Sequence, residues 1–147
     1  MLVLAIDPGA HMGWAVVSRT SLVVCGLGLK SLTSFDCGAK QGIIEIPQYR
    51  GAGQKAPVDD IIKLAYRAGH AAGVLGVKLG VTFETCTPSE WKGSVPKKIH
   101  NARVIAALSE ESLRVYRACT DDIAPSLRNN VTDAIGLGLW HAKREGM

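Results

Sequence analysis

The chain lacks the paired cysteines and histidines of a structural zinc site. None of its four cysteines (Cys25, Cys37, Cys86 and Cys119) forms a C-x-x-C pair, and no histidine lies at zinc spacing beside them. A zinc site of that kind is therefore not expected. We interpret the cysteines as reduced core residues of an intracellular protein.

The chain also lacks a long uninterrupted apolar run. Its longest mostly apolar stretch, residues 65–81, is broken by Arg67, His70, Lys78 and several glycines. Such a stretch is not expected to span a membrane. The first residues show no signal-peptide pattern, and the sequence contains no internal repeat and no low-complexity segment.

Composition indicates a globular chain with a mild excess of positive charge. The 147 residues fit one domain, 47% of them are hydrophobic, and the formal net charge is +4. Lysine and arginine cluster after residue 90, which favours a polyanionic partner, with nucleic acid as the first candidate. Ordinary solubility charge is the alternative at this small excess.

The most informative stretch is the first, LVLAIDPGAHMGWAVV. The apolar run Leu2 to Ile6 predicts a buried strand that ends in Asp7. The Pro8-Gly9 turn follows, and a second apolar run returns as a hairpin partner. A carboxylate at a strand tip commonly binds a metal ion, although Asp7 could also simply begin the turn.

The remaining pattern predicts a mixed α/β protein. Apolar runs predict strands at 2–6, 13–18, 22–29, 42–46 and 81–84. Helical periodicity predicts helices at 59–75, 97–108 and 126–143, with a further one at 109–117. Residues 30–41 are expected to be a polar connection, 49–57 a glycine-rich loop, and 87–90 a helix start. Three antiparallel strands followed by alternating helices and strands indicate a mixed sheet with helices on its faces.

Three carboxylates interrupt apolar surroundings: Asp7, Glu45 and Asp133. A buried carboxylate is costly unless it is paired or binds a cation, so together they predict a divalent metal site. Individually, Glu45 could face solvent and Asp133 could be a helix N-terminal acid. Glu84 is a weaker fourth candidate, and we interpret His141 as a helix-end residue rather than a ligand. No serine or cysteine nucleophile has a convincing neighbouring base.

The chain resembles the RuvC-like Holliday junction resolvases of the RNase H superfamily, and more closely their phage-encoded members. The resemblance spans nearly the whole chain and rests on IDPGAHMGWAVV, IIEIPQY, LAYRAGHAAG, TPSEWKGSVPKK and NNVTDAIGLGLWHA, in that order. It implies a single RNase H-like nuclease domain over residues 1–147, with a five-stranded mixed sheet flanked by helices. It also implies a homodimer that cuts four-way DNA junctions by paired symmetric nicks with two Mg²⁺ ions, for which Mn²⁺ can substitute.

By this resemblance, Asp7 is the acid that bridges both metals, Glu45 the second-strand acid and Asp133 the acid of the last helix. The family pattern has a metal-binding residue three positions before the last acid, and here that residue is Asn130. Positions i and i+3 share a helix face, so the Asn130 carbonyl oxygen can still bind Mg²⁺, but without charge. Asn130 is either a native, weaker ligand or an inactivating substitution; a shifted alignment is the third alternative.

The resemblance also assigns DNA contacts. Lys92, Lys97 and Lys98 are expected to contact phosphates, and Tyr49, with Arg50 beside it, lies where the family places an aromatic that stacks on junction bases. Trp91 is expected to pack rather than touch DNA. The family builds its dimer through the helix that carries Gly69, Gly73 and Gly76, where another backbone could approach; packing on its own sheet is the alternative.

Three other functions remain open. A non-cleaving, structure-selective DNA-binding protein would explain Asn130. A nuclease of the same fold could act on flaps, forks or RNA/DNA hybrids. The actin-like and sugar-kinase ATPases also open with a strand, an Asp and a glycine turn, but they need a second glycine hairpin and a much longer chain.

Overall fold

The computed structural model describes residues 1–146. Its centre is one five-stranded sheet with the order β3-β2-β1-β4-β5. The strands are β1 (Val3–Asp7), β2 (Gly13–Val17), β3 (Leu22–Leu27), β4 (Gln41–Glu45) and β5 (Thr82–Cys86). The first three pair antiparallel, whereas β4 and β5 continue the sheet parallel to β1. The predicted mixed sheet is confirmed.

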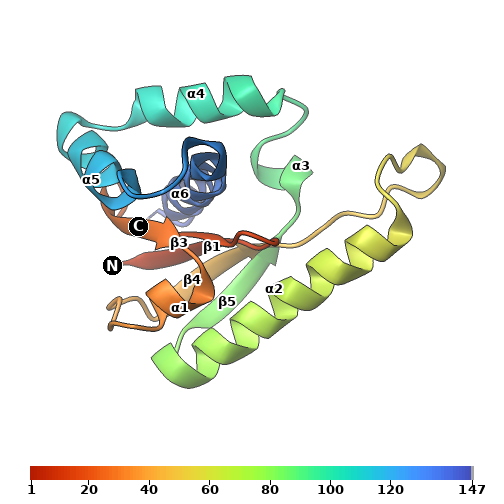
Figure 1. Ribbon diagram of the computed structural model, residues 1–147, viewed down its shortest axis with the longest axis horizontal. Helices are drawn as coiled ribbons and strands as arrows, with labels where there is room; N and C mark the ends of the chain where they lie inside the picture. The colour runs from red at the N-terminus through yellow and green to blue at the C-terminus, as the bar shows by residue number, and fades with distance from the viewer. Residues whose placement is uncertain (147) are drawn as a thin grey trace.

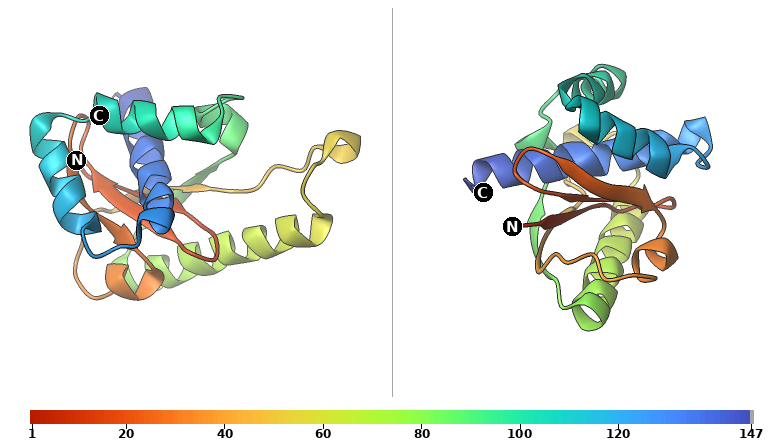
Figure 2. Two further views of the ribbon diagram at one scale, coloured as in Figure 1. Left: turned by 45° about the horizontal axis from the view of Figure 1, so that its top comes forward. Right: turned by 90° about the vertical axis from the view of Figure 1, so that its left-hand side faces the viewer.

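Helices cover both faces of this sheet (Figures 1 and 2). They are α1 (Leu29–Leu32), α2 (Val58–Leu79), α3 (Pro88–Trp91), α4 (Lys97–Ala107), α5 (Glu110–Thr120) and α6 (Arg128–Arg144), with two 3₁₀ turns, η1 (Gly51–Gly53) and η2 (Pro125–Leu127). Helix α6 packs on one face, with α4 over it and α5 beside it against β3, and α2 packs on the other face. No helix within residues 1–146 is both long enough and apolar enough to span a membrane.

Alternation along the strands divides the core into two layers. Val3, Ala5 and Ile43 point toward α6, whereas Leu4 and Ile44 point toward α2. Since successive side chains of a strand face opposite sides of the sheet, Asp7 and Glu45 follow Ala5 and Ile43 onto the α6 side. The strand pattern thereby sets the face on which both carboxylates lie.

Three glycines let α6 pack closely against its neighbours. A Cβ on Gly13 would lie 1.9 Å from the Asn130 carbonyl oxygen, so the start of α6 rests directly on the β2 backbone. Gly138 lies against Val17, and Gly136 lies against α4. Only glycine permits this close approach, which brings the first turns of α6 down onto the sheet.

Most differences from the predicted elements lie at the ends of elements. Strand β5 begins and ends later than expected, and the short α1 occupies part of the expected polar connection. Helix α2 continues past its three glycines to Leu79 and ends at Gly80, which has a left-handed φ of 67°. Glycine weakens a helix by only about 1 kcal/mol per residue, so apolar contacts with the sheet can carry the helix past it.

Candidate functional site

The carboxylates of Asp7, Glu45 and Asp133 come together at one end of the sheet. Asp7 and Glu45 end the adjacent parallel strands β1 and β4, just beyond the paired residues Ile6 and Ile44. Asp133 lies in the second turn of α6, which packs over this end, and it is only 3% exposed. Glu45 and Asp133 both act electrostatically on Asp7. The structure thus brings together three of the predicted site residues.

Because the three carboxylates lie close together, the site carries negative charge that is not fully neutralised. Burial, followed by the neighbouring Glu45 and Asp133 carboxylates, raises the pKa of Asp7 well above its ordinary value. Burial also raises the pKa of Asp133, against the opposing effect of Lys92 and Lys97. The buried Oδ1 of Asp133 has no hydrogen-bond partner among the described residues. Hard carboxylate oxygens that are buried, mutually repelling and partly unpartnered form a donor set that fits Mg²⁺.

Two lysines partly balance these acids. The Lys92 Nζ lies 3.5 Å from Glu45 Oε1, and the Lys97 Nζ lies 3.6 Å from Asp133 Oδ2. The Lys97 side chain is 60% exposed, so it holds its carboxylate from the solvent side and is free to turn away. The predicted basic residues therefore adjoin the carboxylates.

Trp91 holds Glu45 in place, a role that the sequence did not reveal. Its Nε1 donates a 3.0 Å hydrogen bond to Glu45 Oε1, and its ring packs in the core between α3 and α6. The Lys92 ammonium also lies 5.1 Å from the centre of this ring. The expectation that Trp91 packs is correct but incomplete. The sequence could have indicated only that a buried tryptophan N–H usually has a hydrogen-bond acceptor, not which residue supplies it.

Asn130 lies one turn before Asp133 and is half-buried. Its side-chain nitrogen donates to the Leu127 carbonyl oxygen at 3.2 Å, at the start of α6. In this arrangement the amide binds its own helix end. The bond occupies the amide nitrogen and leaves Oδ1 as the possible ligand atom.

Glu84 does not join the three carboxylates. It pairs with Ile43 in the register of β4 and β5, two positions before the pair formed by Glu45 and Cys86. Its neighbours are His141 and Arg144 near the end of α6. The prediction of Glu84 as a ligand of this site is therefore wrong. A strand rises about 3.3 Å per residue, so two residues separate Glu84 from the level of Glu45 along the sheet.

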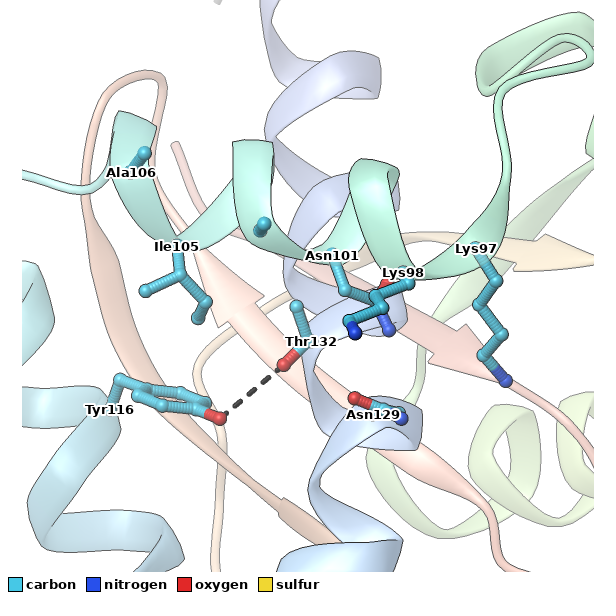
Figure 3. Close-up of a pocket in the computed structure, with 9 residues that line it drawn as sticks. Lys97, Lys98, Asn101, Ile105, Ala106, Tyr116, Asn129 and Thr132 are labelled. Atoms are coloured by element: carbon cyan, nitrogen blue, oxygen red, sulfur yellow. Dashed lines mark hydrogen bonds between the residues drawn. The ribbon is translucent and has the colours of Figure 1, made fainter.

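A groove of about 870 Å³ adjoins the site between α4 and α6 (Figure 3). Lys97 and Lys98 lie at one end, and Tyr116 lies at the other, where its hydroxyl is 3.4 Å from Thr132 Oγ1. Asn101 lines the groove, and within residues 1–146 neither polar atom of its buried side chain has a hydrogen-bond partner. Lys98 thus lines the groove next to Lys97, which pairs with Asp133.

Tyr49 and Arg50 lie away from the carboxylates, on the loop between β4 and α2. This loop projects beyond the body of the molecule (Figures 1 and 2). The Tyr49 side chain is 63% exposed, so it is not packed at the edge of the domain. An exposed aromatic on a projecting loop is available to a partner.

Comparisons with known proteins support the fold. No family model and no curated protein matches the chain. Among solved structures, it is similar to the structure "T. thermophilus RuvC in complex with Holliday junction substrate", with a TM-score of 0.65 and 20% identity over 100% of this chain and 96% of that chain. A second structure, "Thermus thermophilus RuvC structure", has a TM-score of 0.51 and 19% identity over 99% of this chain and 97% of that chain. The chain therefore has the RuvC-like, RNase H-like fold.

Proposed function

We propose that the chain is a metal-dependent endonuclease that cuts branched DNA, with the four-way junction as its main substrate. The observation that carries the proposal is the meeting of Asp7, Glu45 and Asp133 at one end of an RNase H-like sheet, beside Lys92 and Lys97. The neighbour of the same fold whose structure contains a Holliday junction supports the choice of substrate.

The carboxylates would hold two divalent ions, Mg²⁺ or Mn²⁺, which when bound activate water and stabilise the leaving 3′-oxygen. Asp7, which interacts electrostatically with both other acids, would be the carboxylate common to the two ions. Glu45 would hold one side and Asp133 the other. The acids would then be relieved of the mutual repulsion that raises the pKa of Asp7.

Trp91 and the two lysines would prepare the site for DNA. The Trp91 hydrogen bond fixes one oxygen of Glu45, which limits the orientations of that carboxylate. Lys97 can leave Asp133 when a metal ion takes over the charge, and can then reach a DNA phosphate. Lys92 is more buried, at 22% side-chain exposure, and would stay near the scissile phosphate.

Asn130 would contribute a neutral oxygen ligand, Oδ1, while its Nδ2 donates to the Leu127 carbonyl. An amide oxygen binds Mg²⁺ without the attraction of a full negative charge, so we expect weak binding of one of the two ions. Asn130→Asp should therefore lower the Mg²⁺ concentration needed for cleavage.

The remaining DNA contacts would come from two elements. Lys98 lies on the first turn of α4 beside the groove, where it can contact phosphate. Tyr49 and Arg50 on the projecting loop can reach DNA beyond the site, and stacking of Tyr49 on a base would contribute about 1–3 kcal/mol. An enzyme that acts on DNA junctions would work in the cytoplasm of a bacterial or phage-infected cell, and we propose that this chain is phage-encoded.

A homodimer through α2 would supply the second active site. This helix exposes a row of apolar residues, with Ile62 at 59%, Tyr66 at 73% and Val77 at 88% exposure. Nothing lies within 4 Å of a Cβ built on Gly69 or Gly73 in the same stretch, so packing on its own sheet does not explain these two glycines. A second α2 could approach closely there, and a two-fold axis would relate two sites for paired cuts.

The decisive experiment compares labelled substrates: an immobile four-way junction, a flap, a fork, an RNA/DNA hybrid and a plain duplex. Each is incubated with the wild-type chain, Asp7→Asn or Asn130→Asp, in Mg²⁺ and in EDTA. Metal-dependent junction nicks that disappear in Asp7→Asn would support the proposal. Preferred cutting of another substrate would favour a different nuclease of this fold. Tight junction binding without cutting by either the wild type or Asn130→Asp would favour the non-cleaving DNA-binding protein.

A further inference from the structure

A second group of possible metal ligands lies at the edge of the sheet, apart from the three carboxylates. It joins Glu84 of the edge strand β5 to His141 and Glu145 at the end of α6. One ligand atom from each residue lies within 4.8 Å of the other two, and within residues 1–146 no other group of three such side chains is this close. These residues line a pocket of about 450 Å³ together with Lys40, Gln41, Gly42 and Thr82. We propose that Glu84, His141 and Glu145 bind one Zn²⁺ ion.

The presence of His141 distinguishes this group from an ordinary pair of surface carboxylates. It is only 2% exposed, yet it lines the pocket, and its Nε2 lies 3.8 Å from Glu84 Oε2, which is too far for a hydrogen bond. Burial lowers the pKa of His141, which favours the neutral imidazole that donates its lone pair to a metal. A buried imidazole close to two carboxylates, whose Nε2 has no hydrogen-bond partner among residues 1–146, is available to a cation.

The ligand set favours zinc over magnesium. Zn²⁺ binds imidazole nitrogen together with carboxylate oxygen, and three protein ligands plus a water complete its usual four positions. Mg²⁺ prefers oxygen ligands throughout. The two ions should therefore divide between the two sites, with Mg²⁺ at the three carboxylates and Zn²⁺ at the group that contains His141. The earlier expectation of no zinc site concerned closely spaced cysteines and histidines, whereas these ligands are distant in the sequence.

Arg144 occupies the same region and competes with the ion. Its guanidinium lies 3.5 Å from Glu84 Oε2 and 3.1 Å from Glu145 Oε1. It also lies 3.4 Å from His141 Nδ1, and since a guanidinium only donates, Nδ1 must accept and the ring proton resides on Nε2. Zinc binding through Nε2 requires that proton to move to Nδ1 and Arg144 to withdraw. Arg144 is free to do so because it is 46% exposed and already lies over the Trp140 ring.

Bound zinc would tie the edge strand to the final helix. Strand β5 pairs with β4 on one side only, and α6 crosses the other strands. A single ion held by Glu84 and the end of α6 would link two segments far apart in the sequence. Any ligand that binds the folded state alone raises stability, so Zn²⁺ should raise the melting temperature.

The test is Zn²⁺ titration of the full chain by calorimetry and thermal unfolding, with excess Mg²⁺ present to occupy the three carboxylates. We expect one Zn²⁺ per chain and a higher melting temperature. Glu84→Gln and Glu145→Gln should each weaken binding by at least ~10-fold, as loss of a group at a metal site typically does. Arg144→Gln should tighten binding, by about tenfold if one like charge near the ion contributes about 1.4 kcal/mol. Glu110→Gln, an exposed acid on α5, is the matched control.

Three results would overturn the proposal: no Zn²⁺ binding, equal binding by the wild type and both glutamine variants, or unchanged binding by Arg144→Gln. Replacing Zn²⁺ by Co²⁺ shows whether the ion is bound by cysteines or by the proposed site. Thiolate ligands produce charge-transfer absorption with Co²⁺, whereas a histidine and two carboxylates do not. Glu84 and Glu145 are exposed, so their glutamine variants should unfold in EDTA like the wild type, and a changed binding constant would not reflect misfolding.

Discussion

At the scale of single residues, the site is governed by buried negative charge. Asp7, Glu45 and Asp133 lie close together, and only Lys92 and Lys97 offset them. The apolar neighbours of all three acids in the sequence indicated this burial, and their meeting could be predicted from the family resemblance. The Trp91 bond to Glu45 could not, because its donor and acceptor are 46 residues apart and neither residue type specifies the other.

The first prediction concerns pH. Because the pKa of Asp7 is raised in the folded state, folded Asp7 holds a proton that unfolded Asp7 has released. The resulting stabilisation is complete below the ordinary value of 3.8 and is lost as pH rises through the raised folded pKa. In EDTA the wild type should therefore lose stability toward neutral pH relative to Asp7→Asn. The measurement is the free energy of unfolding against pH, and a difference that does not vary with pH would contradict the prediction.

The second prediction concerns Trp91. Trp91→Phe keeps much of the buried ring but removes the donor to Glu45 Oε1, so the carboxylate loses its fixed orientation. Loss of an orienting partner of this kind typically costs 10–100-fold in metal affinity or activity. Metal-dependent cleavage should fall by about that factor while junction binding in EDTA stays the same. Full activity at low Mg²⁺ would show that the hydrogen bond has no such role.

At the scale of elements, α6 is placed by close contact with the sheet. The sequence predicted this helix, all five strands to within two residues at each end, and the helix start at residues 87–90, where Glu90 accepts from the Thr87 N–H at 2.9 Å. It did not predict that Gly13 would lie under Asn130. Helix periodicity depends on neighbours in the chain, whereas this contact depends on how two distant elements pack.

The third prediction tests that contact. Gly13→Ala places a methyl group where the Asn130 carbonyl now lies, so α6 must move away from β2. We expect a loss of ~3 kcal/mol in the free energy of unfolding, at the upper end for overpacking, and a fall in cleavage as Asp133 shifts. Gly53→Ala is the matched control, because nothing lies within 4 Å of its added Cβ. Equal stability of the two variants in urea would contradict the close-packing account.

At the scale of the whole molecule, the proposed function requires two copies. One chain presents one carboxylate site, whereas paired nicks in opposite strands require two sites in a fixed relation. The apolar residues exposed on α2, among them Ile62 and Tyr66, lie outside the core, although helical periodicity predicted the helix that carries them. Apolar periodicity alone does not distinguish a core face from an interface.

The fourth prediction tests this interface. Ile62→Glu places a charge in the exposed apolar row of α2 and should turn a dimer into a monomer in analytical ultracentrifugation. Val23→Glu, an exposed apolar residue on β3, is the control and should leave the dimer intact. The Ile62→Glu monomer should still bind a junction, but more weakly. A wild-type chain that is monomeric at all concentrations would rule out this dimer.

The most direct measurement is the cutting of a supercoiled plasmid that carries an extruded cruciform, followed on a gel in Mg²⁺ and in EDTA. The account predicts that the wild-type chain converts this plasmid to the linear form in Mg²⁺, with little nicked circle, because both strands are cut in one encounter. Asp7→Asn should bind the cruciform and leave it intact. A folded wild-type chain that produces neither linear nor nicked plasmid in Mg²⁺ or Mn²⁺ would contradict the account.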